Sequence, residues 1–209
     1  PYFVNGDKLY SVTFTVDAFG ARTYSANDVS GAETIDGTAL VSMAQNGDQL
    51  CIVAPDFSGQ FNGWIYTVAG GLVQITDVDF DGPVLGVRFN DGYFIFPKAD
   101  SNKWFISDLR DGASYIATDF TSAESDPDDL VIIAPLNGLV YAFGSKTMEP
   151  YQNVGGAGFP YERISSGIQQ KGCVAPRTMT EVNGALIWIG SGDSERPAIY
   201  TTNGGKPEK

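Results

Sequence analysis

The stretch NGLVYAF, residues 137–143, joins an Asn-Gly dipeptide to a run of apolar residues, and the chain contains five stretches of this kind. The dipeptides are Asn5-Gly6, Asn46-Gly47, Asp91-Gly92, Asn137-Gly138 and Asn183-Gly184, which lie 41, 45, 46 and 46 residues apart. Asn-Gly and Asp-Gly suit type I′ hairpin turns, because both central residues of such a turn need a positive φ. The apolar runs that follow are LYSVTF from Leu9, LCIV from Leu50, YFIF from Tyr93, LVYAF from Leu139 and ALIWI from Ala185. Each stretch therefore predicts a hairpin turn followed by a strand.

A repeat of roughly 40–50 residues with several short strands is typical of a β-propeller blade. We therefore predict an all-β fold, a β-propeller-like array of about five antiparallel blades with a 41–46-residue repeat. The expected blades cover approximately residues 1–37, 38–82, 83–125, 126–176 and 177–209. They form either a single β-propeller domain over residues 1–209 or a propeller fragment of a longer chain, because the sequence begins without Met and ends in strand-like sequence.

The runs after the five turns are apolar at nearly every position, which indicates strands buried on both faces. We expect them to be inner strands, placed between neighbouring blades. WIYTV (64–68) and KWFIS (103–107) alternate more and are expected to be half-exposed outer strands. An Asp36-Gly37 turn is expected to close the first unit.

Composition narrows the function. The formal net charge of −12 gives the chain no bulk attraction for nucleic-acid phosphates or anionic lipid. No apolar run is long enough to span a membrane. Cys51 and Cys173 are expected to be buried free thiols. The chain has no histidine, so an enzyme of this sequence would have to use carboxylates, Lys or Tyr.

Two acidic segments are candidate sites. Asp77, Asp79 and Asp81-Gly82 spell D-x-D-x-D-G, the opening of a calcium loop, but position 12 of that loop is Arg88 instead of the bidentate Glu. The alternative is an acidic turn between blades, and we predict no functional metal.

The second acidic segment contains Asp126, Asp128 and Asp129. Paired carboxylates can act as general acid and base. The alternative, which we favour, is a solvated loop that enters the strand LVIIA (130–134).

A basic group is formed by Lys98, Lys103 and Arg110, which fall near aromatic strand residues. Such a strip can bind single-stranded nucleic acid. Three positive charges against a net charge of −12 do not favour that reading, and we expect no nucleic-acid binding.

The segment from 144 to 176 carries a family resemblance. It reads GSKTMEPYQNVGGAGFPYERISSGIQQKGCVAP and resembles the packaged-DNA stabilisation proteins of short-tailed, P22-like phages, also called tail accessory or head-closure hub proteins. The matching positions are Phe143, Gly144, Thr147, Glu149, Tyr151, Asn153, Phe159, Pro160, Tyr161, Arg163, Ile164, Gly172, Cys173, Ala175 and Pro176. Further stretches agree in order along most of the chain. The family often has Asp-Pro-Asp-Phe-Pro where this chain has DVDFD (77–81), which makes the calcium-like spacing incidental.

The resemblance implies a structural virion protein without catalytic residues, cofactor or metal. Copies would form a ring at the tail vertex, below the portal and its adaptor, close the channel after DNA packaging, and dock the tail needle and tailspikes. Assembly would take place in the host cytoplasm. The alternative is a carbohydrate-binding or carboxylate-dependent glycosidase β-propeller. Carboxylates converging in a central cleft would favour that alternative, and an apolar centre would favour the structural protein.

Residues 154–176 are long for a connection within a compact blade, where loops beyond about 12–15 residues are usually functional or disordered. Apolar anchors suggest an ordered excursion, with the tip at residues 169–171 left available. We predict partner docking through Phe159, Tyr161 and Arg163. The alternative is that the segment only crosses from one blade to the next.

Overall fold

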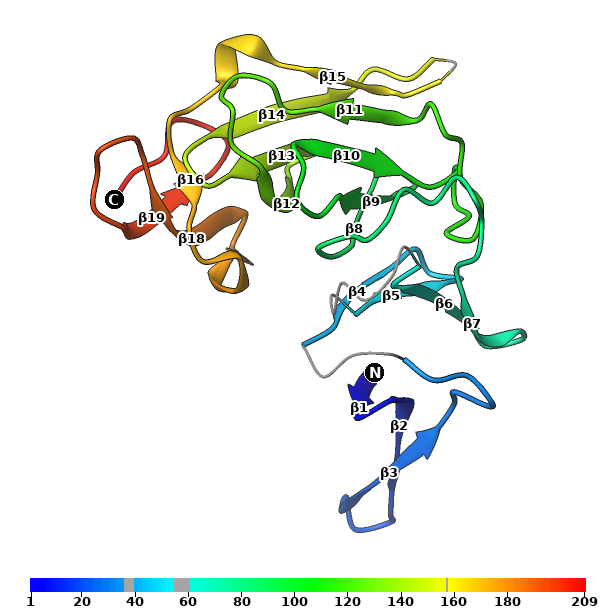
Figure 1. Ribbon diagram of the computed structural model, residues 1–209. Helices are drawn as coiled ribbons and strands as arrows, with labels where there is room; N and C mark the ends of the chain where they lie inside the picture. The colour runs from blue at the N-terminus through cyan, green and yellow to red at the C-terminus, as the bar shows by residue number, and fades with distance from the viewer. Residues whose placement is uncertain (36–39, 55–60, 157) are drawn as a thin grey trace.

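The protein is an open arc of five antiparallel sheets (Figure 1). The structure, a computed structural model, describes residues 1–35, 40–54, 61–156 and 158–209. The Asp36-Gly37 turn lies outside the described residues. Helical structure within them consists of two 3₁₀ turns, η1 (Ser165–Gly167) and η2 (Pro176–Thr178). In this described part of the chain, no helix has the length and apolar character needed to cross a membrane.

Each sheet is built from strands that follow one another closely in the chain. Sheet 1 contains β1 (Tyr2–Asn5), β2 (Lys8–Val16) and β3 (Arg22–Asp28). Sheet 2 contains β4 (Ser42–Gln45), β5 (Leu50–Val53), β6 (Gly63–Thr67) and β7 (Gly71–Gln74). Sheet 3 contains β8 (Arg88–Asn90), β9 (Tyr93–Pro97), β10 (Lys103–Ile106) and β11 (Phe120–Ser122). Sheet 4 contains β12 (Leu130–Leu136), β13 (Leu139–Gly144), β14 (Met148–Asn153) and β15 (Tyr161–Arg163). Sheet 5 contains β16 (Gly172–Cys173), β17 (Thr180–Val182), β18 (Ala185–Ser191) and β19 (Ala198–Thr202). The all-β, propeller-like prediction is confirmed.

Three of the five marked turns have the predicted type I′ geometry. Each is a two-residue loop with positive φ at both residues: 49° and 93° at Asp91-Gly92, 52° and 78° at Asn137-Gly138, and 51° and 76° at Asn183-Gly184. The short polar side chain of Asn or Asp tolerates this left-handed backbone, and Gly has no side chain to clash.

The type I′ prediction is wrong at the first two turns. Asn5 pairs with Lys8, so the loop consists of Gly6 and Asp7, of which only Gly6 has a positive φ. The loop that begins at Asn46 has four residues. The Asn46 side chain accepts hydrogen bonds from the backbone N–H groups of Asp48 and Gln49. These dipeptides therefore make a turn by a different local hydrogen-bond pattern.

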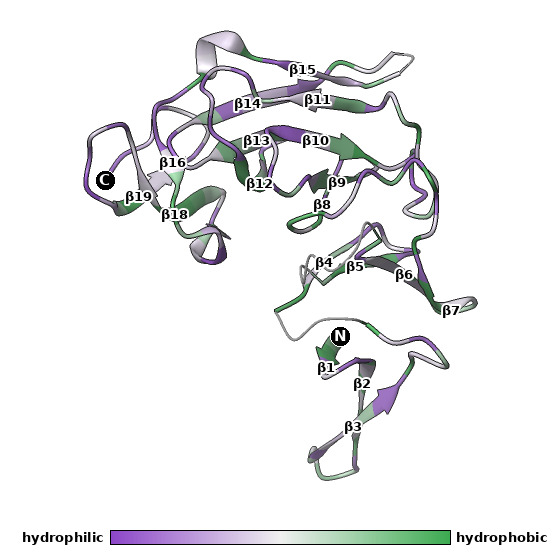
Figure 2. Ribbon diagram, viewed as in Figure 1, coloured by the Kyte–Doolittle hydropathy of each residue, from purple (hydrophilic) through white to green (hydrophobic). Residues whose placement is uncertain are grey.

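Four apolar clusters fill the spaces between the five sheets. Strand alternation sends Cys51 and Val53 toward sheet 3, and Ile52 toward sheet 1. In the same way, Phe96 packs toward sheet 2 and Ile95 toward sheet 4. Figure 2 shows the resulting hydrophobic strands, such as β9, β12 and β18, and the hydrophilic β3. A sheet covered on both faces needs apolar residues at consecutive positions, which explains the continuous apolar runs.

The runs after the first four turns are the second strands of their sheets, and the run after the fifth turn, β18, is the third strand of sheet 5. The strands before the turns, β4, β8 and β12, are the ones that approach each other on the concave side of the arc. Double burial is confirmed for β5, β9 and β13, because each has a strand on either side and a sheet on either face.

Two further expectations about burial are wrong. The runs WIYTV and KWFIS form third strands, and Trp64 and Trp104 are fully buried because they too lie inside a four-stranded sheet. In sheet 1, the far half of β2 is exposed, since the β2–β3 hairpin extends beyond sheet 2 (Figure 1). Both cysteines are buried free thiols as predicted, and burial raises the pKa of Cys173 to about 11.

We predict that Phe96→Ala lowers the free energy of unfolding by about 3–5 kcal/mol, because it leaves a cavity in the core between sheets 2 and 3. The matched control is Val73→Ala on β7, an exposed position where the change should stay within about 0.5 kcal/mol. Denaturant unfolding of both variants measures the difference. Equal losses would contradict the double burial of β9.

Candidate functional site

The segment from 154 to 176 gives sheet 4 its outermost strand and then crosses to sheet 5. Strand β15 pairs with β14, and β16 pairs with β18. Phe159 and Tyr161 pack against Trp104 of sheet 3, with ring centroids 5.1 and 5.4 Å away. The Tyr161 hydroxyl donates to the Asn90 carbonyl at 3.1 Å, and burial raises the pKa of Tyr161 to about 12. The segment thus fastens sheet 4 to sheet 3.

Arg163 reaches a buried carboxylate. Glu149 on β14 is 1% exposed, and one of its oxygens accepts from both the backbone N–H and the hydroxyl of Ser125, at 2.8 and 2.6 Å. The other oxygen accepts from the Tyr151 hydroxyl at 3.1 Å and from Arg163 Nη1 at 3.2 Å. Burial, reinforced by the Glu149 charge, raises the pKa of Tyr151. Four donors compensate a charge that would be costly to bury alone.

The three predicted docking residues therefore lie close together, but their main contacts are within the protein and stabilise the fold. Tyr161 is buried, Phe159 is half-buried, and the Arg163 side chain keeps 35% of its surface exposed. Lys171, at the end of the predicted free tip, forms an ion pair with Glu195 at 2.6 Å. Docking through Phe159, Tyr161 and Arg163 stays a prediction, and the exposed part of Arg163 is the part that could meet a partner.

We predict that Arg163→Ala lowers the free energy of unfolding by about 1–3 kcal/mol, because it leaves the buried Glu149 with one donor fewer and no countercharge. Arg110→Ala is the matched control, since Arg110 pairs with Asp48 at the surface and should contribute less than about 1 kcal/mol. Chemical denaturation compares the two. A loss no larger in Arg163→Ala than in the control would rule out a structural role for this pair.

The carboxylates of the calcium-like motif are bound to other groups of the protein. Asp77 accepts from the backbone N–H groups of Asp79 and Tyr115, at 2.9 and 3.2 Å. Asp81 forms ion pairs with Lys98 and Lys103. Burial raises the pKa of Asp81, but hydrogen bonds from the two lysines lower it by more, so the net shift is downward. Two cations on Asp81 compete with a metal for the same oxygens.

We predict that calcium titration of the protein gives no calorimetric signal at this loop. The lysines already neutralise Asp81, and the loop has no closing Glu. A micromolar isotherm that disappears in Asp79→Ala would overturn the prediction. Asp100→Ala, in a separate turn, is the control for general loss of acidic charge.

Asp128 stabilises a turn, a role that was not predicted from the sequence. Its carboxylate accepts from the Lys146 backbone N–H at 2.7 Å and from the Thr147 hydroxyl at 2.8 Å, so it holds the turn between β13 and β14. Asp129 is exposed, as expected for a solvated loop, and Asp126 is half-buried. The three carboxylates therefore do not act as one group.

The basic residues are paired with acids. Lys98 and Lys103 share Asp81, and Arg110 pairs with Asp48 at 3.2 Å. A strip whose charges are neutralised in this way offers little net attraction to phosphate. The expectation of no nucleic-acid binding stays a prediction.

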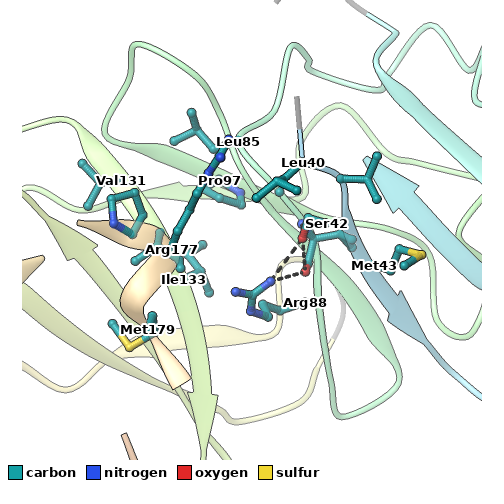
Figure 3. A pocket seen from close by; sticks show the side chains of 15 residues that line it. Leu40, Ser42, Met43, Leu85, Arg88, Pro97, Val131, Ile133, Arg177 and Met179 are labelled. Atoms are coloured by element: carbon teal, nitrogen blue, oxygen red, sulfur yellow. Dashed lines mark hydrogen bonds between the residues drawn. The ribbon is translucent and has the colours of Figure 1, made fainter. Parts of the chain in front are cut away.

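A cavity of about 490 Å³ lies on the concave side of the arc, where sheets 2 to 5 meet (Figure 3). Its lining residues are Leu40, Val41, Ser42, Met43, Leu85, Gly86, Val87, Arg88, Pro97, Val131, Ile132, Ile133, Pro176, Arg177 and Met179. We call it the axial cavity. Two of these residues, Arg88 and Arg177, are charged, and none is acidic.

The axial cavity was not predicted from the sequence. Arg88 stood out only because it occupies the place of a calcium-binding Glu, and Arg177 carried no signal. The cavity combines short segments from four sheets, far apart in sequence. The position of each segment just before a marked turn was the usable clue, because the strands before the turns prove to be the innermost.

Comparison with known proteins gives the family. The family model described as "Bacteriophage P22 Gp10, beta-propeller" matches residues 1–209. Tail hub protein gp10 of Salmonella phage P22 is 24% identical over 200 aligned residues, and the match covers 90% of this chain and 41% of gp10. The chain thus spans less than half the length of this curated relative.

Solved structures give weaker likenesses. Hsv2 of Kluyveromyces lactis has a TM-score of 0.46 at 15% identity and covers 80% of this chain and 47% of its own. Glutaminyl cyclase of Myxococcus xanthus has a TM-score of 0.42 at 10% identity, with 88% and 82% covered. These scores support no argument about fold or activity. Because the family model covers every residue from 1 to 209, the chain belongs to the bacteriophage P22 Gp10 β-propeller family of phage tail hub proteins.

Proposed function

We propose that this chain is the propeller part of a non-enzymatic hub protein that closes the portal channel, retains packaged DNA and docks other tail proteins. Copies form a ring at the tail vertex of the virion, assembled in the host cytoplasm, with the portal adaptor, tail needle and tailspike as partners. The observation that carries the proposal is the family match over the whole chain. The full-length relative is longer, so the ring and its partners belong to the proposal.

The packing of the arc supports a mechanical role. Four apolar clusters join the five sheets, and the central strands of sheets 2, 3 and 4 are buried on both faces. Interiors of this kind have low compressibility and transmit strain. A stiff scaffold with many loops is suited to holding partners in fixed positions.

The charge supports closure of the channel by obstruction. A net charge of −12 repels the DNA backbone, and the basic groups Lys98, Lys103 and Arg110 are paired with acids. Retention of DNA would then depend on a closed exit and not on neutralising phosphates.

The glycosidase alternative needs two carboxylates facing a substrate cleft. Among the residues that the structure describes, the lining of the axial cavity contains none. The buried carboxylate Glu149 is held by four donors and lies outside that lining. Both observations favour the structural reading.

Docking through the 154–176 segment is proposed at the outer face of β15. Phe159 and Tyr161 anchor this strand to sheet 3, while Glu162 and part of Arg163 are exposed. In this arrangement two of the three residues position the strand and the exposed side chains contact the partner.

Complementation of phage that lack the full-length protein tests the proposal. Without the protein, we expect heads that fill with DNA and then lose it, and that bind no needle or tailspike. Heads that keep their DNA and assemble complete tails without it would overturn the proposed function.

Two matched variants then test the docking face. Glu162→Lys on β15 should fold normally and reduce attachment of tail proteins at least about tenfold, because a reversed charge at an interface costs more than 1.4 kcal/mol. Glu181→Lys on β17, equally exposed and remote from β15, should attach normally. Equal attachment by both variants would remove β15 from the docking surface.

A further inference from the structure

Arg88 places a cation in the axial cavity, and in the part of the chain that the structure describes it has no acidic partner. Its Nη1 donates to the Ser42 hydroxyl at 3.2 Å and to the Val87 carbonyl at 2.8 Å (Figure 3). Both acceptors are neutral. Within the described residues neither Arg88 nor Arg177 forms an ion pair. A guanidinium has five N–H donors in a planar fork, so most of the binding capacity of Arg88 is unused.

The position of Arg88 is fixed by the fold. The Ser42 hydroxyl bridges sheets 2 and 3, since it accepts from the Val87 N–H at 3.0 Å and donates to the Val87 carbonyl at 3.2 Å. This bridge holds the first residue of β8 at the cavity wall. A binding group held by backbone contacts loses little conformational freedom when a ligand arrives.

The environment of Arg88 disfavours an isolated charge. Burial lowers the pKa of its guanidinium, which reports lost hydration of the cation. Arginine nevertheless stays protonated in proteins. An incoming anion would supply the missing countercharge, and charge-assisted hydrogen bonds to a guanidinium are among the strong ones.

Apart from Ser42 and Arg177, the rest of the wall is apolar, and it sets the second property of the ligand. Leu40, Met43, Leu85, Val131, Ile133 and Met179 line the cavity. A bare phosphate or the backbone of duplex DNA would lose hydration against these side chains without compensation. A carboxylate on an apolar body satisfies both the guanidinium and the walls.

We propose that the axial cavity is a binding site for an amphipathic carboxylate. Its oxygens accept hydrogen bonds from Arg88, its apolar part packs on Leu85, Val131 and Met179, and Arg177 is a second cation of the lining. The volume of about 490 Å³ lies within the range of small-ligand sites. The proposal concerns ligand binding and stands apart from the role in the tail.

Octanoate is the probe, titrated into the full-length protein by calorimetry. We expect saturable binding, with octanol and acetate each at least about tenfold weaker, because each lacks one of the two required parts. Inorganic phosphate should also bind more weakly than octanoate. Binding of octanol or of phosphate with the same affinity as octanoate would overturn the proposal.

Arg88→Gln should weaken octanoate binding at least about tenfold, since a hydrogen-bonded charge is lost. Arg110→Gln, outside the cavity, should leave it unchanged. Should Arg88→Gln fail to fold, chemical modification of the unaltered protein replaces it. Octanoate should then slow the reaction of Arg88 with phenylglyoxal and leave the rate at Arg110 unchanged, as read by mass spectrometry. Equal rates at Arg88 with and without octanoate would refute the site.

Discussion

Each central sheet of this protein is apolar on both faces, and the rest of the architecture depends on that constraint. Alternation along a single strand such as β9 sends Phe96 to one core and Ile95 to the next. Such a sheet has no face that can remain in water, so it needs a neighbour on either side. Stacking in an arc satisfies the requirement for sheets 2, 3 and 4. It also brings the strands before the turns together on the concave side, where the axial cavity lies.

The repeat could be predicted from the sequence because it depends on local chemistry. Positive φ at Asp91-Gly92, Asn137-Gly138 and Asn183-Gly184 needs these residue types, and the same chemistry sets the period. The order of strands within a sheet is a tertiary property. A strand buried on both faces has the same apolar sequence whether it is the first or the second strand of its sheet. The alternation around Trp64 and Trp104 predicted half-exposed strands, although neighbouring sheets cover them.

The candidate sites were harder to predict, because their chemistry depends on long-range partners. Asp81 sits in a motif that suggests calcium, yet residues 17 and 22 positions later neutralise it. Glu149 and Arg163 were visible only through the family resemblance, and their contact shows that this motif includes an internal ion pair. Arg88 and Arg177 each precede a marked turn, but that position does not show that their side chains line one cavity, since sheets 3 and 5 bring them there.

Polar contacts join neighbouring sheets along the arc. Ser42 joins sheet 2 to sheet 3 through Val87, Tyr161 joins sheet 4 to sheet 3, and the Asn137 side chain donates to the Asn203 carbonyl of sheet 5. Sheet 1 packs on sheet 2 through an apolar cluster and through Tyr2, whose ring lies 5.3 Å from that of Tyr66 and whose hydroxyl interacts with the Tyr66 hydroxyl. The far half of the β2–β3 hairpin in sheet 1 is exposed and has few buried apolar contacts, so this end of the arc should open first.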